Sequence, residues 1–272
     1  SRYLPHAVNG AHFYKYKEAA DKAKITELRR RILVESAIPK YQNVSKTLFF
    51  WNNRNARRKQ SGTMVWWFKE WLDKVGHDKA TLLMHTDAQD PHGQDLPHLI
   101  EHLDISEGQI LLSTNKVDAV DLAAMYNAAD FTINISDAEG FGLATLESLA
   151  CGTPIIVNMT GGLQEQVTNG KDWFGWGIQP SSKAVIGSLS VPYIYEDRVS
   201  QADFEKALSS ALNASKKAYN KMSKEGMKHV AENYNFEKFE REWIETMDNF
   251  VKEHGSWKDR KGYKRWHLME VA

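Results

Sequence analysis

Short runs of apolar and β-branched residues recur along the first two thirds of the chain. A continuous run of this kind, bounded by polar or turn-forming residues, is typical of a strand that is buried on both faces of a sheet. The pattern therefore predicts five buried strands, at 47–51, 81–85, 109–113, 131–136 and 154–157.

Segments with the period of an amphipathic helix lie between these runs. They cover 62–74, 96–103, 118–129 and 142–150. Strands that alternate with helices at this spacing form βαβ units, which build a parallel sheet with helices on both faces. We therefore expect an α/β fold with a doubly wound, Rossmann-like parallel sheet.

The segments outside this alternation are expected to be mostly helical. Residues 18–35 are charged and fit a helix that covers the sheet, and helical patterns follow at 202–217, 222–233 and 236–252. Residues 173–197 contain no element that the pattern assigns. We interpret them as an extension, with a binding loop as one reading.

The net charge of the chain is zero, because 35 Lys and Arg residues balance 35 Asp and Glu residues. No overall field draws the protein to nucleic acid or to an anionic membrane, although peripheral membrane contact stays open. The C-terminal stretch 255–271 mixes aromatic with basic residues. We expect it to pack on a neighbouring domain rather than to bind nucleic acid.

Cys151 is the single cysteine of the chain, which excludes an internal disulfide and favours a reducing compartment such as the cytoplasm. The longest apolar runs are far shorter than the roughly 20 residues of a membrane-spanning helix. The hydrophobic fraction of 42% suffices for a large core. A globular protein with a local ligand site is therefore expected.

The loop at 137–142 (DAEGFG) follows the fourth predicted strand and precedes a helix. Ligands of such sheets bind where the carboxyl ends of the strands lead into helices. Gly140 and Gly142 let the backbone turn tightly and approach a ligand closely. Because the free N–H groups of the first helical turn carry partial positive charge, the loop is a natural phosphate site.

Two carboxylates, Glu139 and Glu147, flank this phosphate site and would repel a phosphate directly. Ionised carboxylates only accept hydrogen bonds, so they require a ligand that offers hydroxyl groups on either side of its phosphates. A nucleotide sugar meets that requirement. We expect Glu139 to bind the sugar hydroxyls and Glu147 to bind the ribose diol.

The loop after the first predicted strand supplies the positive charge that a diphosphate needs. It contains Arg54, Arg57, Arg58 and Lys59. Arg54 can hold a phosphate with its planar fork, and Lys59 can act as a point charge. Two cations and the helix N-terminus could then stabilise a departing diphosphate without a metal ion.

Four motifs resemble those of retaining GT-B glycosyltransferases of the glycogen-synthase-like and sucrose-phosphate-synthase-like group. EGFGLATLESLACGTPIIV, from Glu139, is similar to the paired-glutamate signature of that group. RNARRK, from Arg54, resembles its Arg and Lys spaced five apart. GGLQE, from Gly161, and YLPHAVNGAHFY, from Tyr3, resemble its Gly-Gly-x-x-Glu turn and the segment that opens its C-terminal domain. The motifs occur in the family's order.

The resemblance implies a role for each candidate residue. Glu139, Arg54 and Lys59 would form the catalytic set, in which Arg54 and Lys59 hold the diphosphate and Glu139 holds the donor sugar. The residues that complete the substrate site would be Gly140, Phe141, Gly142, Leu143 and Thr145 around the sugar, Glu147 at the ribose, and Asn115, Lys116 and Val117 at the base. The family transfers its sugar with retention of configuration and uses neither a metal nor another cofactor.

The resemblance also implies how the chain is organised. Residues 1–272 would form one nucleotide-sugar-binding domain, with about 236–272 as a helical tail. The family has two such domains with the active site between them, and this sequence begins where the second one begins. An acceptor-binding domain or chain is therefore an expected partner.

The sequence departs from the family pattern at several loop positions. Asn53 and Gln60 replace glycines beside the Arg and Lys, and Ala7 and Asn9 replace the usual Gly and Asp. The loop 85–92 (HTDAQDPH) replaces a short glycine-rich turn. These departures leave the charge pattern intact but leave the identity of the donor open.

Other kinds of site are weighed against this one. A metal site drawn from His85, Asp87, Asp90, His92, His98 and His102 lacks a convincing third ligand at zinc spacing. Cys151 has no histidine near it in sequence and is interpreted as a small packing residue. The glycines at 140 and 142 are a poor dinucleotide fingerprint, and no serine shows the nucleophile-elbow pattern.

Two other functions remain open at this point. The chain could be a non-catalytic nucleotide-sugar-binding or interaction module that has kept the donor pocket and lost transfer. A nucleic-acid-binding protein, based on residues 54–59 and the C-terminal stretch, comes third, and it predicts strongly salt-dependent duplex binding.

Overall fold

The computed structural model describes residues 2–256 and 258–259 of the chain. Six parallel strands form one sheet in the order β3-β2-β1-β4-β5-β6. They are β1 Thr47–Asn52, β2 Ala80–His85, β3 Ile110–Ser113, β4 Phe131–Asn134, β5 Ile155–Asn158 and β6 Gly175–Ile178. The expected α/β fold with a parallel, doubly wound sheet is therefore confirmed.

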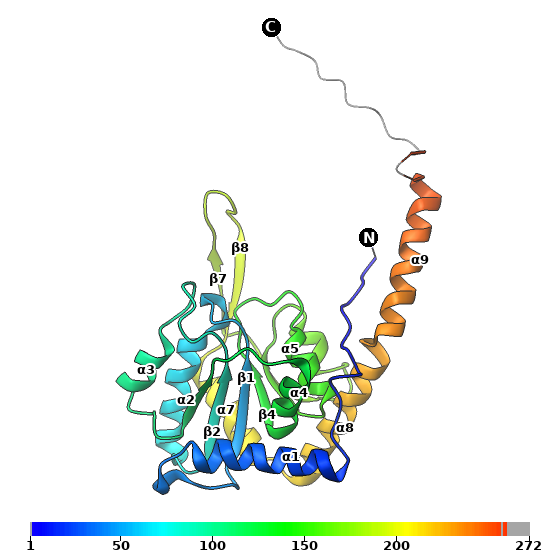
Figure 1. The fold of residues 1–272 in the computed structure, drawn as a ribbon. Helices are drawn as coiled ribbons and strands as arrows, with labels where there is room; N and C mark the ends of the chain where they lie inside the picture. The colour runs from blue at the N-terminus through cyan, green and yellow to red at the C-terminus, as the bar shows by residue number, and fades with distance from the viewer. Residues whose placement is uncertain (1, 257, 260–272) are drawn as a thin grey trace.

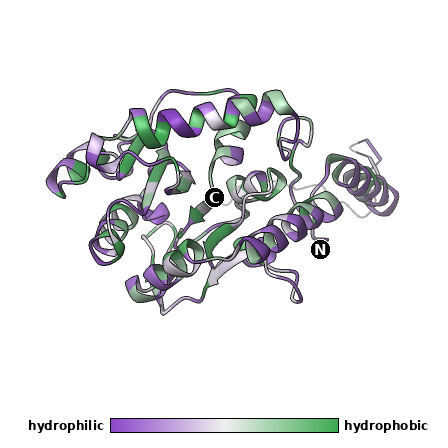
Figure 2. Ribbon diagram, turned by 90° about the horizontal axis from the view of Figure 1, so that it is seen from below, coloured by the Kyte–Doolittle hydropathy of each residue, from purple (hydrophilic) through white to green (hydrophobic). Residues whose placement is uncertain are grey.

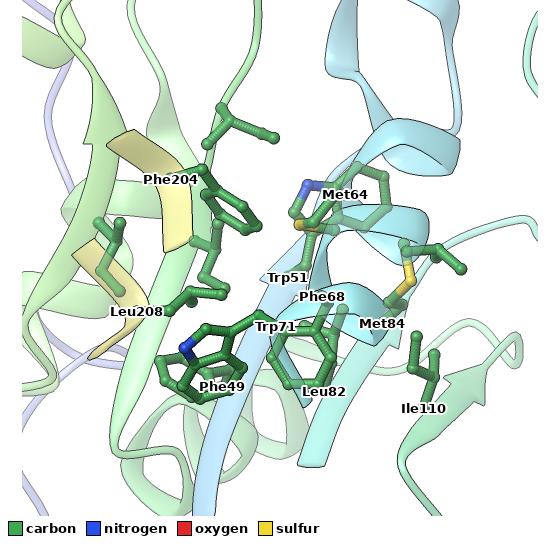
Figure 3. Close-up of a cluster of buried hydrophobic side chains, with 14 of the residues drawn as sticks. Phe49, Trp51, Met64, Phe68, Trp71, Leu82, Met84, Ile110, Phe204 and Leu208 are labelled. Carbon is green, nitrogen blue, oxygen red and sulfur yellow. The ribbon is translucent and has the colours of Figure 1, made fainter. Parts of the chain in front are cut away.

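Three helices cover one face of the sheet. They are α2 Ser61–Val75, α3 Leu96–His102 and α7 Gln201–Leu212. Figure 3 shows side chains of α2 and α7 against the strands, where Phe68 and Trp71 of α2 lie against Phe49 of β1. Burial of these large aromatic side chains is the dominant favourable contribution to folding on this face.

A second hydrophobic core lies on the other face of the sheet. It is covered by α1 Ala19–Arg30, a π-helical turn Arg31–Glu35, α4 Ala119–Ala128, α5 Leu143–Ala150, α6 Leu163–Val167 and α8 Lys216–Asn233. Figure 2 shows hydrophobic strands between helices of mixed hydropathy. The period-2 alternation of strand side chains explains the two cores, since Phe49 faces one and Phe50 faces the other.

The structure corrects the helical pattern expected after residue 201. The single helix predicted at 202–217 ends at Leu212. A new helix, α8, then begins at Lys216 because the Ser215 side chain accepts a hydrogen bond from the Ala218 N–H at 3.2 Å and caps it. The expected helix at 222–233 is thus only the later part of α8.

The segment 173–197, which the sequence pattern left unassigned, contains regular structure. It supplies the edge strand β6 and most of an antiparallel hairpin, β7 Ser182–Ile186 and β8 Ile194–Arg198. The hairpin projects above the edge of the sheet at which the parallel strands end (Figure 1). It therefore stands at the edge where ligands of such sheets bind.

The last described helix, α9 Phe236–His254, extends away from the sheet (Figure 1). It has no buried residue and exposes apolar side chains that include Ile244 and Phe250. Within the described residues no helix is long and apolar enough to cross a membrane. Most of the aromatic and basic stretch 255–271 lies outside the described residues, so its expected packing is untested.

Candidate functional site

The loops that follow β1 and β4 contact each other at the carboxyl edge of the sheet. The Asp137 N–H donates a hydrogen bond to the Arg58 carbonyl at 2.8 Å, and the Arg58 Nη1 donates to the Ala138 carbonyl at 2.6 Å. The predicted cationic loop and the predicted glycine loop are therefore neighbours. Their side chains can act on one ligand.

Lys59 and Glu139 form an ion pair between these two loops. Lys59 lies in a short 3₁₀ turn, Arg57–Lys59, and its Nζ contacts Glu139 Oε2. The two side chains are only 9% and 10% exposed. Burial lowers the pKa of Lys59, and the neighbouring carboxylate partly offsets that effect. The two predicted site residues thus balance each other's charge in the free protein.

The backbone of the glycine loop is shaped by close contacts with the GGLQE turn. A Cβ on Gly161 would lie 1.8 Å from the Glu139 carbonyl oxygen, so only glycine fits there. Gly142 has a φ of 93° and occupies the N-cap of α5, where no side chain of the described residues caps the helix. No side chain of the described residues therefore competes with an anion for the first N–H groups of α5.

Thr145 has a structural place in this loop. Its hydroxyl donates to the Gly142 carbonyl at 2.7 Å and also contacts Gln166 Oε1. The residue is fully buried. Its hydroxyl holds the turn that leads into α5, and this position supports the loop rather than a direct contact with ligand.

Glu147 is fixed by two side chains that the sequence analysis did not identify. The Tyr126 hydroxyl donates to Glu147 Oε2 at 2.9 Å, and Asn52 Nδ2 donates to the Tyr126 oxygen at 2.8 Å. Burial raises the pKa of Glu147, whereas the hydrogen bond from Tyr126 lowers it. Tyr126 belongs to an apolar helix pattern, so nothing in the sequence marked it as a site residue.

Arg54 is not in contact with Glu139 but is held by the loop that follows β2. Its Nε and Nη2 donate to the Asp90 carboxylate at 2.6 and 3.2 Å, and Nη2 lies 2.8 Å from His92 Nδ1. These contacts give Asp90 and His92 a role beside Arg54 instead of the metal-site role weighed above. Within the described residues no cluster of three or more His, Cys, Asp or Glu side chains could hold a metal ion.

Arg57 connects the cationic loop to the β7–β8 hairpin. Its Nη1 and Nη2 donate to the two oxygens of Glu196 at 3.0 and 2.5 Å. The Glu196 side chain is 2% exposed, and the hydrogen bonds from Arg57 lower its pKa. No sequence pattern indicates this pair, because its members lie 139 residues apart.

Asn115, Lys116 and Val117 follow β3, as predicted. Asn115 and Lys116 are exposed, and Val117 lines a cavity of about 420 Å³ between α1 and α4. No hydrogen bond or ion pair joins them to Glu139 or Lys59 within the described part of the chain. A ligand would have to span the distance between the two groups.

A larger cavity, of about 940 Å³, lies away from this site. It is lined by the N-terminal segment, by α8 and by the start of α9, and it includes Ala150, the last residue of α5. Lys59 and Glu139 meet near the other end of α5. At 1.5 Å per residue the two ends are about 12 Å apart, so the larger cavity is separate from the site.

Comparison with known proteins gives the context of this arrangement. Residues 89–229 match the family described as Glycosyl transferases group 1. A D-inositol 3-phosphate glycosyltransferase from Arthrobacter sp. (strain FB24) is 32% identical over 98 residues, which are 36% of this chain and 22% of the relative.

Two solved structures share the fold. The sucrose-phosphate synthase from Thermosynechococcus elongatus has a TM-score of 0.67 at 20% identity, over 93% of this chain and 53% of that one. Anabaena Alr3699/HepE, solved in complex with UDP and glucose, has a TM-score of 0.66 at 14% identity, over 90% of this chain and 56% of that one. The chain thus spans about half the length of these proteins.

Proposed function

This chain belongs to the family of group 1 glycosyl transferases, and we propose that it is the donor-binding half of a retaining, metal-independent hexosyltransferase. It binds a nucleoside-diphosphate sugar, and an acceptor-binding domain or chain completes the active site. The observation that carries the proposal is the meeting of Lys59, Glu139 and the glycine-capped N-terminus of α5 at the carboxyl edge of the sheet.

The diphosphate binds between the cationic loop and the first turn of α5. Lys59 Nζ and the exposed guanidinium of Arg54 offset its charge, and the free N–H groups of α5 donate hydrogen bonds to it. Lys59 now contacts Glu139, so the incoming phosphate exchanges one anionic partner of the ammonium for another. Because Lys59 is already buried in the free protein, ligand binding does not have to desolvate it.

The two carboxylates bind the hydroxyl groups on either side of the diphosphate. Glu139, released from Lys59, accepts hydrogen bonds from the hexose. Glu147 accepts from the ribose, with its orientation set by Tyr126. Asn115, Lys116 and Val117 border the base. The structure of Anabaena Alr3699/HepE, which was solved in complex with UDP and glucose, supports a uridine donor as the first to test.

The transfer step needs charge stabilisation more than covalent chemistry from this domain. The bond between the anomeric carbon and the diphosphate oxygen breaks, and the acceptor oxygen forms its new bond on the same face of the sugar. The leaving phosphate oxygen receives the proton of the acceptor hydroxyl. Lys59 and Arg54 stabilise the negative charge that develops on the leaving diphosphate.

Titration calorimetry with UDP, GDP and ADP, each with and without magnesium, tests this proposal. We expect one diphosphate to bind, equally well without magnesium, and Lys59→Ala to weaken it by about tenfold or more, since a charged hydrogen bond contributes about 1.5 to 3 kcal/mol. Lys224→Ala, a change on an α8 surface, is the matched control. Absence of binding by all three diphosphates, or unchanged affinity in Lys59→Ala, would refute the proposal.

A further inference from the structure

We propose that Asp90 is a positioning residue of the diphosphate subsite, and that its carboxylate holds the Arg54 guanidinium in place for the phosphates. This inference rests on the function proposed above and extends it to the loop after β2. That loop, at 85–92, is the part of the chain that departs from the family's short glycine-rich turn.

The geometry around Arg54 leaves part of its guanidinium available. Asp90 engages Nε and Nη2, whereas no hydrogen bond from the described residues engages Nη1. The Arg54 side chain is 60% exposed and the Asp90 side chain only 9%. The carboxylate therefore lies behind the guanidinium. Nη2 also lies 2.8 Å from His92 Nδ1, so Nη1 is the nitrogen that stays available to an anion.

The other well-paired arginine of the same loop shows the contrasting arrangement. Arg57 uses both Nη1 and Nη2 on the buried carboxylate of Glu196, so its fork is fully occupied. It fastens the loop to β8. Arg54, paired through its inner edge, keeps the geometry of a phosphate ligand.

The loop that carries Asp90 is itself fixed before any ligand binds. Asp90 Oδ1 accepts the His92 N–H at 2.8 Å, and the His92 carbonyl accepts the Arg57 N–H at 3.0 Å. Asn55 Nδ2 donates to the Gln94 carbonyl at 2.7 Å. Because Asp90 sits on this docked loop, Arg54 is ordered in the free protein and binding does not have to restrict it again.

A double-mutant cycle on nucleotide binding tests the inference. The four proteins are the wild type, Arg54→Ala, Asp90→Asn and the double variant, and the probe is whichever of UDP, GDP and ADP binds the wild type most tightly. We expect Asp90→Asn to weaken binding about fivefold, the effect of ordering one long side chain on binding. In the Arg54→Ala background the same change should weaken binding no further, because Asp90 acts through Arg54.

Two controls separate positioning from damage to the loop. Asp87→Asn removes the same charge from the same loop, where the Asp87 carboxylate accepts the Gln89 N–H at 3.1 Å and no hydrogen bond joins it to Arg54, and should weaken binding less than Asp90→Asn does. The matching nucleoside, which lacks phosphates, should bind wild type and Asp90→Asn alike. If Asp90→Asn lowers the melting temperature by several degrees, the double-mutant cycle is repeated with Asp90→Ser in its place.

The outcomes distinguish this inference from the proposed function. If no diphosphate binds the wild type, both are overturned. If a diphosphate binds the wild type and Lys59→Ala weakens that binding, the proposed function stands. The role of Asp90 is then rejected if Asp90→Asn has no effect on binding, tightens it, or weakens it equally in the Arg54→Ala background. Equal losses for nucleoside and diphosphate also reject it.

Discussion

At the scale of single residues, the candidate site is a set of charges that are already paired. Lys59 contacts Glu139, Arg57 contacts Glu196 and Arg54 contacts Asp90. Buried charges are tolerated only when they are paired and hydrogen-bonded. Ligand binding at such a site exchanges partners, and the affinity depends on how the ligand competes with the residue that it displaces.

The exchange at Lys59 can be measured through stability. Glu139→Gln leaves the buried ammonium of Lys59 without its anionic partner and should lower the free energy of unfolding by about 2 kcal/mol. This is less than the roughly 3 to 5 kcal/mol expected for breaking a fully buried pair, because both groups keep some exposure. Removing both charges in Lys59→Met with Glu139→Gln should recover part of that loss. Urea unfolding checks both values, and a double variant less stable than Glu139→Gln would contradict the pairing.

The role of Glu147 gives a second prediction at this scale. Glu147→Gln keeps the size of the side chain but weakens acceptance of the ribose hydroxyls. It should lower the preference for a ribonucleoside diphosphate over its 2′-deoxy analogue by about fivefold, less than the roughly tenfold or more of a complete hydrogen bond to a charged group, because the amide oxygen of Gln still accepts. Calorimetry with both nucleotides measures that ratio. Tyr126→Phe should lower it less, and a ratio unchanged in Glu147→Gln would remove the ribose assignment.

The sequence indicates which charged residues belong to the site but not which residues orient their side chains by hydrogen bonds. Lys59 and Glu139 could be placed together because each follows a buried strand of one parallel sheet. Asp90 and Tyr126 could not, since one lies in a loop of unusual length and the other has the pattern of a core residue. Their roles depend on side-chain directions that residue spacing does not determine.

At the scale of secondary-structure elements, the β7–β8 hairpin is joined to the site by partly buried polar contacts. Glu196 pairs with Arg57, the Asp197 N–H donates to the Asp137 carbonyl at 2.8 Å, and Thr160 Oγ1 donates to Asp197 Oδ2 at 2.8 Å. The root of the hairpin thus contacts the cationic loop, the glycine loop and Thr160, the residue that precedes the GGLQE turn. Its position and that of the cationic loop are coupled.

Glu196→Gln should therefore lower the free energy of unfolding by about 1 to 2 kcal/mol, because it weakens two hydrogen bonds to a buried carboxylate. The loss is limited because solvent screens the charge of the half-exposed Arg57. The folded-state pKa of Glu196 lies below its ordinary value of 4.5, so its contribution is complete above that pH and is lost as the pH falls through the folded-state value. The difference from wild type should accordingly shrink below about pH 4.5. Urea unfolding at pH 7 and pH 4, with the exposed change Asp248→Asn as control, measures it; a difference that grows on acidification would contradict the pairing.

The elements themselves were predictable where hydrophobic runs were continuous. The five predicted strands are present, and their bounds shift by one or two residues. The sixth strand, β6, was missed because Gly175 and Gly177 interrupt its apolar pattern. A Cβ on Gly175 would lie 1.8 Å from the Ile155 carbonyl oxygen, so the glycine that hid the strand is required for its packing.

At the scale of the whole molecule, the order of the strands brings the candidate residues to one edge. Strands β1 and β4 lie side by side at the centre of the sheet, although α2, β2, α3, β3 and α4 separate them in sequence. Successive strands are added on one side of β1 up to β3 and on its other side from β4 onward. This reversal of strand order opens the crevice in which ligands of open α/β sheets bind. The fold therefore accounts for where Lys59 and Glu139 meet, and the family assignment agrees with it.

A crystal structure of this chain grown with saturating UDP tests the central claim most directly. The account predicts the diphosphate within hydrogen-bond distance of Lys59 Nζ and of the first N–H groups of α5, with the Glu139 carboxylate moved away from Lys59. A nucleotide bound in the cavity beside Ala150, or a Lys59–Glu139 pair left intact beside bound UDP, would contradict it.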